Sequence, residues 1–434
     1  MKKVLIITYY WLPSGGAGVQ RWVKFTKYLR DFGWEPVIYT PENPEYPSFD
    51  GSFEKDIATD IEVIKTPIWE PFDIYRSLLG KRGQTINAGF ISEDKGKGWK
   101  DKLSVWIRGN FLIPDPRKFW IRPSASFLCK YLKEHPVDAI VTTGPPHSMH
   151  LIGMRLKRNF PDIKWLADFR DPWTNIDFYK DLHLTKWADK IHHRLEKKIV
   201  CHADAVIVVS KGMKDEFSIL RTDGLHIIPN GYDEDDVKIV STLLDEKFTI
   251  SHIGTMNGAR NPLAVWKALQ NLCIQVDDFS RDLVIQLIGK TDFAVLEAIN
   301  ENGLTKNLHK INYLTHDEAI IKQHSSQVLL LLINRSANAK SILTGKFFEY
   351  LASGRPVLGV GPMDGDAAAI LNETGAGVMV DFDDVEMAKE TILHYYKLYK
   401  KNQLTLKAGS VEKYSRKNLT ENLSDLLNHT TANA

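Results

Sequence analysis

A lysine and a glutamate stand near the start of a short predicted helix in SILTGKFFEYLASGRPVL, residues Ser341–Leu358. Lys346 and Glu349 are three residues apart and so share one helical face. Thr344 is placed to cap this helix, and Gly354 suits the left-handed position just past its end. An exposed helix N-terminus attracts phosphate, and a nearby carboxylate can hold a ribose diol, so the segment is suited to a nucleotide. A solvated ion pair on an ordinary helix explains the pattern equally well.

A glycine loop is the second feature suited to phosphate. Gly15, Gly16 and Gly18 follow the predicted strand Val4–Tyr10 and precede a helix. Glycines let the backbone approach a phosphate, and the helix N-terminus supplies N–H groups. The spacing is not the G-x-G-x-x-G of dinucleotide-binding proteins, although Glu42 after the second strand imitates their acidic residue. An NAD(P)-linked oxidoreductase therefore stays a distant alternative. If the loop binds no ligand, it is an ordinary turn between a strand and a helix.

Two polar motifs in the same half directly follow predicted strands, at the ends where parallel sheets bind ligands. His147 lies in the motif TTGPPHS and can act as a base or position a hydroxyl. Asp171 lies in DFRDPW, where Asp168 and Asp171 flank Arg170. A salt-bridged scaffold is therefore the alternative to an acceptor-binding role for Asp171, and assigning a base needs geometry first.

The sequence predicts no metal site. The acidic run at Asp381–Asp384 imitates a metal-binding triplet, but Asp384 has the position of a helix cap. His192 and His193 are adjacent, so they point to different sides of a helix and cannot chelate one ion.

Bulk properties limit the class of protein. A chain of 434 residues with 43% hydrophobic and 25% charged residues is typical of a soluble protein of two domains. The net charge of +2 does not indicate a nucleic-acid partner.

Three scattered cysteines give no disulfide framework and favour a reducing cytoplasm. The apolar runs Val4–Tyr10 and Val328–Ile333 are too short for a signal peptide or a membrane span, and they are predicted to be strands.

Short apolar strands alternate with helical stretches, which predicts an α/β fold with parallel sheets. The strands predicted in the two halves are Val4–Tyr10, Pro36–Thr40, Ala139–Thr143, Lys164–Asp168 and Ala205–Ser210, then Phe248–Ile253, Leu283–Ile288, Leu308–Asn312, Val328–Ile333, Pro356–Val360 and Gly377–Val380. The acidic stretch Asp233–Glu246 is predicted to be a linker. We expect Rossmann-like domains at residues 1–235 and 236–412, with a last helix at about 413–434 that packs back on the first domain.

Residues 81–122 break this alternation with a segment rich in Lys, Arg and Trp. Trp99, Trp106 and Trp120 are candidates for a lipid interface at which basic side chains meet anionic headgroups. The structural alternative is an insertion whose aromatic side chains pack on their own domain.

Taken together, these motifs resemble family 4 glycosyltransferases of GT-B fold, of the kind that builds bacterial surface polysaccharides. The resemblance extends along most of the chain and rests on segments that occur in the family's order: the glycine loop followed by GVQRW, VSKGMKDEF, IIPNGYD, HIGTMNGARNP and TGKFFEYLASGRPVL. It implies two Rossmann-like domains facing an interdomain cleft. The first domain would hold the acceptor and the second the nucleotide-sugar.

The resemblance also implies roles for individual residues. Arg260 and Lys346 would stabilise the departing diphosphate, and Glu349 would hold the ribose. Glycines in both halves would line the donor, namely Gly15, Gly16, Gly18, Gly254 and Gly289. His147 and Asp171 would arrange the acceptor side. Two positively charged side chains would stabilise the diphosphate leaving group, because it develops negative charge during the transfer.

The sequence departs from the family at two positions. Thr255 stands where a basic residue usually follows the glycine, and we expect Lys346 to supply the missing charge. Ser341 stands where the first of two glutamates usually touches the transferred sugar. This second departure leaves the donor sugar and the details of the mechanism open.

The predicted function is transfer of a sugar from a nucleotide-sugar donor to a hydroxyl of a glycan or lipid-linked acceptor, with retention and without a required metal or a permanently bound cofactor. We expect a cytoplasmic protein, with peripheral contact to the inner membrane surface and no nucleic-acid partner. A nucleotide-sugar 2-epimerase and a catalytically silent glycan- or lipid-binding protein are the alternatives.

Overall fold

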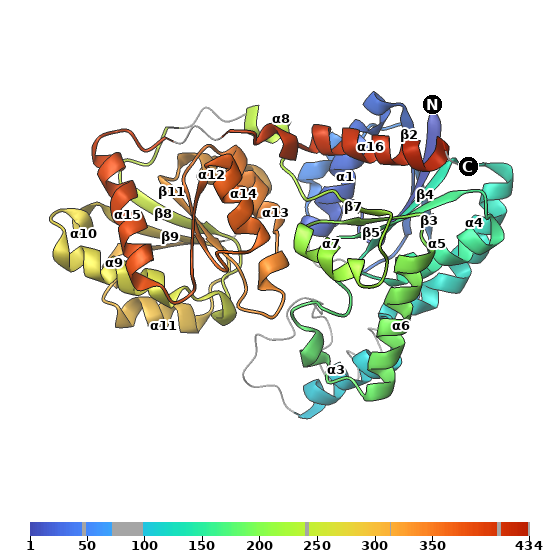
Figure 1. The fold of residues 1–434 in the computed structure, drawn as a ribbon, viewed down its shortest axis with the longest axis horizontal. Coiled ribbons are helices and arrows are strands. Elements are labelled where there is room, and N and C mark those ends of the chain that lie inside the picture. Colours follow the sequence, from blue (N-terminus) through green and yellow to red (C-terminus); the bar gives the residue numbers. More distant parts are fainter. Residues whose placement is uncertain (46–48, 72–98, 239–242, 313, 406–408, 433–434) are drawn as a thin grey trace. The chain divides into compact units, whose positions relative to one another are not determined.

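The computed structural model describes residues 1–45, 49–71, 99–238, 243–312, 314–405 and 409–432. The chain divides into two compact units, and each is an α/β unit built on its own parallel sheet (Figure 1). Unit 1 comprises Met1–Pro229 and Arg416–Ala434, and unit 2 comprises Asn230–Ser415. The α/β fold class predicted from the strand–helix alternation is confirmed.

Unit 1 is built on a parallel seven-stranded sheet with the order β3-β2-β1-β4-β5-β6-β7. Its strands are β1 (Lys2–Ile7), β2 (Trp34–Pro41), β3 (Glu62–Thr66), β4 (Ala139–Gly144), β5 (Lys164–Phe169), β6 (Ala205–Val208) and β7 (Leu225–Ile227). Sequence patterning missed the edge strands β3 and β7. Edge strands are only half covered, so they lack the continuous apolar run that marks a buried parallel strand.

Helices cover both faces of this sheet, because side chains of a strand alternate between its faces. Val4 and Ile6 pack in one cluster with residues of α1 and α16, while Leu5 and Ile7 pack in another with residues of α4 and α5. The α-helices of unit 1 are α1 (Ala17–Leu29), α3 (Trp99–Phe111), α4 (Ile121–Glu134), α5 (Ser148–Asn159), α6 (Lys186–His202), α7 (Lys211–Ser218) and α16 (Arg416–Ala432). The C-terminal helix α16 lies along α1 (Figure 1).

Unit 2 is built on a parallel six-stranded sheet with the order β10-β9-β8-β11-β12-β13. Its strands are β8 (Phe248–Ile253), β9 (Leu283–Ile288), β10 (Leu308–Ile311), β11 (Val328–Leu332), β12 (Val357–Val360) and β13 (Gly377–Val380). Every strand predicted in this half is present, with ends that agree to within a residue.

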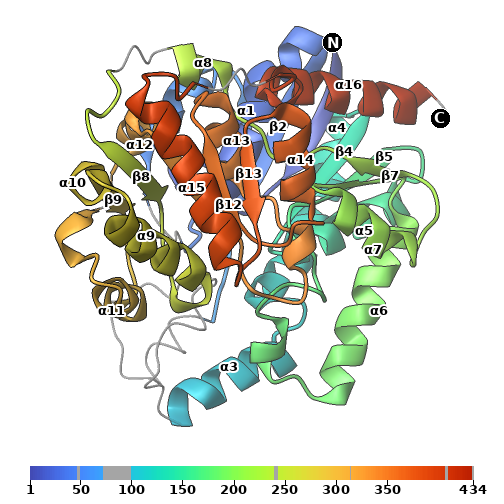
Figure 2. The ribbon, with the colours of Figure 1, turned by 60° about the vertical axis from the view of Figure 1, so that its left-hand side comes forward.

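Helices α9 and α15 lie side by side on one face of this sheet, and residues of α13 and α14 form the core on the other face (Figure 2). The α-helices of unit 2 are α8 (Glu234–Lys238), α9 (Leu263–Gln275), α10 (Phe279–Asp282), α11 (Phe293–Glu301), α12 (His316–Ser325), α13 (Gly345–Ala352), α14 (Asp366–Thr374) and α15 (Val385–Lys400). Asp384 caps α15 by accepting a hydrogen bond from the backbone N–H of Met387, as its sequence position predicted.

Each sheet has one point at which the strand order reverses, and such switch points are where open α/β sheets bind ligands. In unit 1 the reversal lies between β1 and β4, and in unit 2 it lies between β8 and β11. The carboxyl ends of these strands carry most of the residues that the sequence singled out.

The basic and aromatic segment is only partly described. Residues 81–98 of the predicted insertion lie outside the described residues, and α3 begins at Trp99. Trp120 was predicted as a candidate lipid contact, and this is wrong. It is buried in the core of unit 1 and stacks on Tyr39, with ring centroids 4.9 Å apart.

Candidate functional site

Lys346 lies at the switch point of unit 2, in the first turn of α13. Its Nζ atom donates a 2.7 Å hydrogen bond to the backbone oxygen of Ile253, the last residue of β8. The next residue, Gly254, has a φ of 123°, and any Cβ there would collide with Nζ of Lys346. Glycine at position 254 therefore makes room for the lysine at the end of β8.

Gly289 repeats this arrangement at the end of the neighbouring strand β9. Its φ is 106°, and a Cβ would lie 3.1 Å from the backbone oxygen of Gly254. Two strand ends thus meet through bare backbone, which is the kind of surface that a phosphate can approach closely. The structure brings together Gly254, Gly289 and Lys346, which the sequence singled out from separate motifs.

Arg260 joins this cluster from the 3-10 turn Gly258–Arg260 that follows β8. Its Nε atom donates a hydrogen bond to the side chain of Asn334, just after β11, and it also contacts the backbone oxygen of Thr255. Burial lowers the pKa of Lys346 to about 8, and the nearby positive charge of Arg260 adds to this shift, while Glu349 opposes it. The two cations therefore lie close enough to repel each other, and an anion between them would relieve that cost.

Glu349 follows Lys346 by three residues on α13 and is half-buried. Its Oε2 atom accepts a 2.9 Å hydrogen bond from Nε2 of Gln323, on α12. Gln323 was not predicted as a site residue, since nothing in the sequence relates it to this helix. Thr344 is the N-cap residue, but its side chain accepts no capping hydrogen bond, so the predicted side-chain cap is wrong.

The glycine loop and Arg170 meet in unit 1. A Cβ at Gly18 would collide with the guanidinium of Arg170, which itself donates a hydrogen bond to the backbone oxygen of Pro145. Gly16 has a φ of 100°, which favours glycine, whereas nothing within 4 Å crowds its missing side chain. The arginine thus connects the loop after β1 to the loop after β4.

His147 is the N-cap residue of α5 and is nine-tenths buried. Its ring stacks on Trp173, with centroids 4.5 Å apart and an interplanar angle of 1°. Burial lowers the pKa of His147 well below its usual range, and repulsion from His150 and Arg170 adds to this. His147 is therefore a neutral imidazole at pH 7, which makes it a poor acceptor of a full proton.

Asp168 is the centre of a buried scaffold. Its two carboxylate oxygens accept hydrogen bonds from Arg21 at 2.8 and 3.2 Å, and also from Trp22 and Thr143. Burial raises the pKa of Asp168, but the charge of Arg21 and these hydrogen bonds outweigh it and leave the pKa lowered. Arg21 also donates to the backbone oxygens of Ile228 and Pro229, so it fixes the chain where unit 1 ends.

Arg21 was missed as a key residue because its partner is 147 positions away in the sequence. Asp171, by contrast, has an exposed side chain. Its predicted role toward an acceptor therefore stays a prediction.

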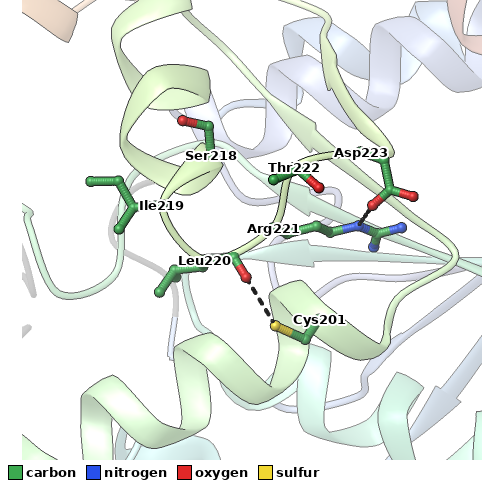
Figure 3. Close-up of a pocket in the computed structure, with 7 residues that line it drawn as sticks. All are labelled: Cys201, Ser218, Ile219, Leu220, Arg221, Thr222 and Asp223. Atoms are coloured by element: carbon green, nitrogen blue, oxygen red, sulfur yellow. Dashed lines mark hydrogen bonds and ion pairs between the residues drawn. The ribbon is translucent and has the colours of Figure 1, made fainter.

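A surface pocket of about 460 Å³ is lined by Cys201 and by the turn between α7 and β7, residues 218–223 (Figure 3). Arg221 lies in it and donates hydrogen bonds to the backbone oxygens of Val200, Ala203 and Asp204. The pocket precedes β6 and β7, so it lies at the amino ends of the strands. The predicted site residues of unit 1 lie at the opposite, carboxyl ends, and this pocket is distinct from them.

Within the described part of the chain, no helix is long and apolar enough to cross a membrane. The same residues contain no group of three or more His, Cys, Asp or Glu side chains arranged to hold a metal ion.

Comparison with known proteins gives a fold, and one family model matches part of the chain. Residues 90–236 match the model of Glycosyltransferase Family 4. No curated protein matches the chain. Among solved structures, a sucrose-phosphate synthase from Thermosynechococcus elongatus matches with a TM-score of 0.63 and 14% identity, over 100% of both chains.

Two further solved structures have the same fold. An Anabaena protein, HepE, in complex with UDP-glucose, matches with a TM-score of 0.54 and 13% identity over 100% of this chain and 99% of that one. A putative UDP-N-acetylglucosamine 2-epimerase from Listeria monocytogenes matches with a TM-score of 0.55 and 11% identity over 100% and 97%. At such identities the likeness shows the fold, and it confirms the predicted pair of Rossmann-like domains.

Proposed function

We propose that this chain, which has the GT-B fold, is a family 4-like glycosyltransferase that moves a sugar from a nucleotide-diphosphate-sugar to a hydroxyl of a glycan or lipid-linked acceptor. In this proposal the reaction retains the anomeric configuration, needs no metal, and serves surface polysaccharide biosynthesis at the cytoplasmic face of the membrane. Residues 1–235 with the last helix would serve the acceptor, and residues 236–412 would serve the donor.

The observation that carries the proposal is the convergence of Lys346 and Arg260 on the bare backbone at Gly254. Two cations that repel each other beside positive-φ glycines are suited to a diphosphate, which neutralises both and needs close backbone approach. Glu349 would then accept hydrogen bonds from the ribose. The UDP-glucose bound to the Anabaena protein supports a nucleotide-sugar donor for this chain.

On the acceptor side, His147 and Asp171 would orient the attacking hydroxyl, with the loop at Gly15, Gly16 and Gly18 beside them. Because the ring of His147 is neutral, it would act through a hydrogen bond and not through ion pairing. The glycine loop would contact the donor phosphates through its N–H groups.

The test is thermal denaturation of the purified protein with UDP-, GDP-, ADP-, dTDP- and CMP-sugars, in the presence of EDTA. One class of diphosphate sugar should raise the Tm, because a ligand of the native state stabilises it. CMP-sugars are the internal control, since they have a single phosphate and should give no shift. A shift only with CMP-sugars, or only after a divalent ion is added, would contradict the proposal.

A nucleotide-sugar 2-epimerase is the second candidate, favoured by the full-length likeness to the Listeria protein. Incubation of UDP-N-acetylglucosamine without acceptor in D₂O distinguishes the two. An epimerase would form the epimer and exchange the hydrogen on C2, whereas a transferase would leave both unchanged. Donor binding without any turnover would instead favour a silent binding protein.

We also propose a peripheral contact with anionic lipid. Phe111, at the end of α3, and Trp187, at the start of α6, are 59% and 67% exposed, and exposed Lys102 and Lys186 lie on the same two helices. Aromatic side chains with nearby lysines favour a headgroup interface. Co-sedimentation with phosphatidylglycerol vesicles at low salt, lost at high salt, is expected. Absence of binding at both salt concentrations would contradict this contact.

A further inference from the structure

His150 lies one turn after His147 on α5, and its ring is completely buried. Its Nδ1 atom is 2.8 Å from the hydroxyl of Thr142, and that hydroxyl accepts a 3.0 Å hydrogen bond from Nε1 of Trp165. Because an indole N–H can only donate, the direction of this second bond is fixed. The hydroxyl of Thr142 keeps one hydrogen to donate, and the ring of His150 is the other group within its reach among the described residues.

This chain of bonds favours one tautomer of His150, because a Thr142 hydroxyl that did not donate to the ring would leave its own hydrogen without a partner among the described residues. In that tautomer Thr142 donates to Nδ1, and the single proton of the neutral ring lies on Nε2. Burial lowers the pKa of His150 to about 3, so the ring stays neutral at pH 7. The Nε2–H group is therefore a hydrogen-bond donor, and among the described residues it has no partner.

Nδ1 of His147 is the matching group. It too is buried and finds no partner among the described residues. Both atoms flank Gly144, because a Cβ built there would lie 2.6 Å from Nε2 of His150 and 3.0 Å from Nδ1 of His147. A side chain at position 144 would therefore crowd both nitrogens, and glycine lets them lie on the same side of the backbone.

We infer that one buried water beside Gly144 joins the two rings, accepting from Nε2–H of His150 and donating to Nδ1 of His147. An unpaired buried polar atom destabilises the fold, and one water satisfies both nitrogens. His147 then carries its proton on Nε2. His147 thereby becomes a hydrogen-bond donor. The place of its proton depends on three positioning residues, Trp165, Thr142 and His150.

The tautomer inferred for His147 does not depend on the proposed function, but its consequence for catalysis does. As a donor, Nε2–H of His147 would bind an oxygen of the sugar or acceptor and would not remove a proton from it. Trp173 fixes the plane of the same ring by stacking, and its own Nε1–H donates to Nδ1 of His192 at 3.0 Å.

The test is the set of ring ¹⁵N chemical shifts of His147 in the unliganded full chain at pH 7. We expect the Nε2–H tautomer in the wild-type protein. His150→Phe keeps the stacking on Phe169 but removes the donor, and it should give a mixture of tautomers; Thr142→Val should act in the same direction. His193→Gln, at an exposed position, is the control and should change nothing.

A proton on Nδ1 of wild-type His147, or a charged ring at pH 7, would overturn the inference even if no variant folds. In a donor-transfer assay, His150→Phe should lower kcat and leave the KM for the donor unchanged. An unchanged tautomer together with an unchanged kcat in that variant would also overturn it. Since the ¹⁵N measurement needs no substrate, it stands or fails independently of the proposed glycosyl transfer.

Discussion

The two switch points of this protein have the same topology but opposite electrostatics. In unit 2, two cations repel each other beside bare backbone at Gly254, and the pKa of Lys346 is lowered to about 8. In unit 1, the buried charges of Arg21 and Asp168 are matched, and the neighbouring His147 is a neutral ring stacked on an indole. The first site is suited to a multiply charged anion, whereas the second holds a matched ion pair beside a neutral ring.

This contrast suggests a division of roles. A site that binds phosphate needs positive charge, and it tolerates a cost in stability to keep two cations close together. A site that binds a sugar hydroxyl needs fixed, neutral hydrogen-bonding groups, and it gains precision from a rigid buried scaffold. Under the proposed function, the same strand-end geometry would serve both purposes, because the side chains, and not the fold, determine the chemistry.

The largest expected effect is on the stability of unit 1. Replacing Asp168 with Ala removes the carboxylate that balances the buried charge of Arg21, so we expect a loss of about 3–5 kcal/mol in the free energy of unfolding. Urea denaturation measures this loss. The exposed pair of Lys340 and Asp364 in unit 2 is the control, and Lys340→Ala should leave the unfolding curve nearly unchanged. Equal effects of the two variants would remove the contrast between the units.

The second effect is on turnover. Lys346→Ala removes a cation that stabilises the departing diphosphate, and we expect kcat to fall by about 10²–10³-fold. Arg260→Ala should act in the same direction, because its charge reaches the same anion. The exposed Lys340→Ala is again the matched control and should retain its rate. Near-normal turnover in both site variants would refute the assignment of these cations.

The third effect compares the two glycine positions. Gly254→Ala would push Lys346 out of place, and we expect a loss in donor affinity of up to about 100-fold, since small displacements are costly. Gly16→Ala meets no atom within 4 Å, so only its positive φ opposes the change. That variant should lose about 1–3 kcal/mol of stability and keep most of its donor affinity. Isothermal titration with the donor nucleotide distinguishes the two.

The smallest effect is a pH dependence. Lys346 has a pKa of about 8 in the unliganded protein, so its charge is present at pH 7 and is mostly lost at pH 9. Donor affinity should therefore fall by about tenfold between these values, because only the charged lysine attracts the diphosphate. Lys346→Arg keeps its charge over this range and should give a flat profile. A flat profile in the wild-type protein would show that Lys346 does not contact the anion.

Several features were readable from the sequence because they are local. The alternation of apolar strands and helices predicted both sheets, and every predicted strand of unit 2 is present. The cap at Asp384 depends only on the three residues that follow it. Lys346 and Glu349 could be singled out because a helix determines how residues three apart are placed.

Only the tertiary structure decided the rest, because it depends on residues distant in the sequence. It buried Trp120 against Tyr39, and it paired Arg21 with Asp168 across 147 positions. It also brought His150, Thr142 and Trp165 into one chain of hydrogen bonds next to His147. The sequence alone determined which side chains follow the strand ends; the charge and proton of each group depend on burial and partners, which exist only in the folded chain.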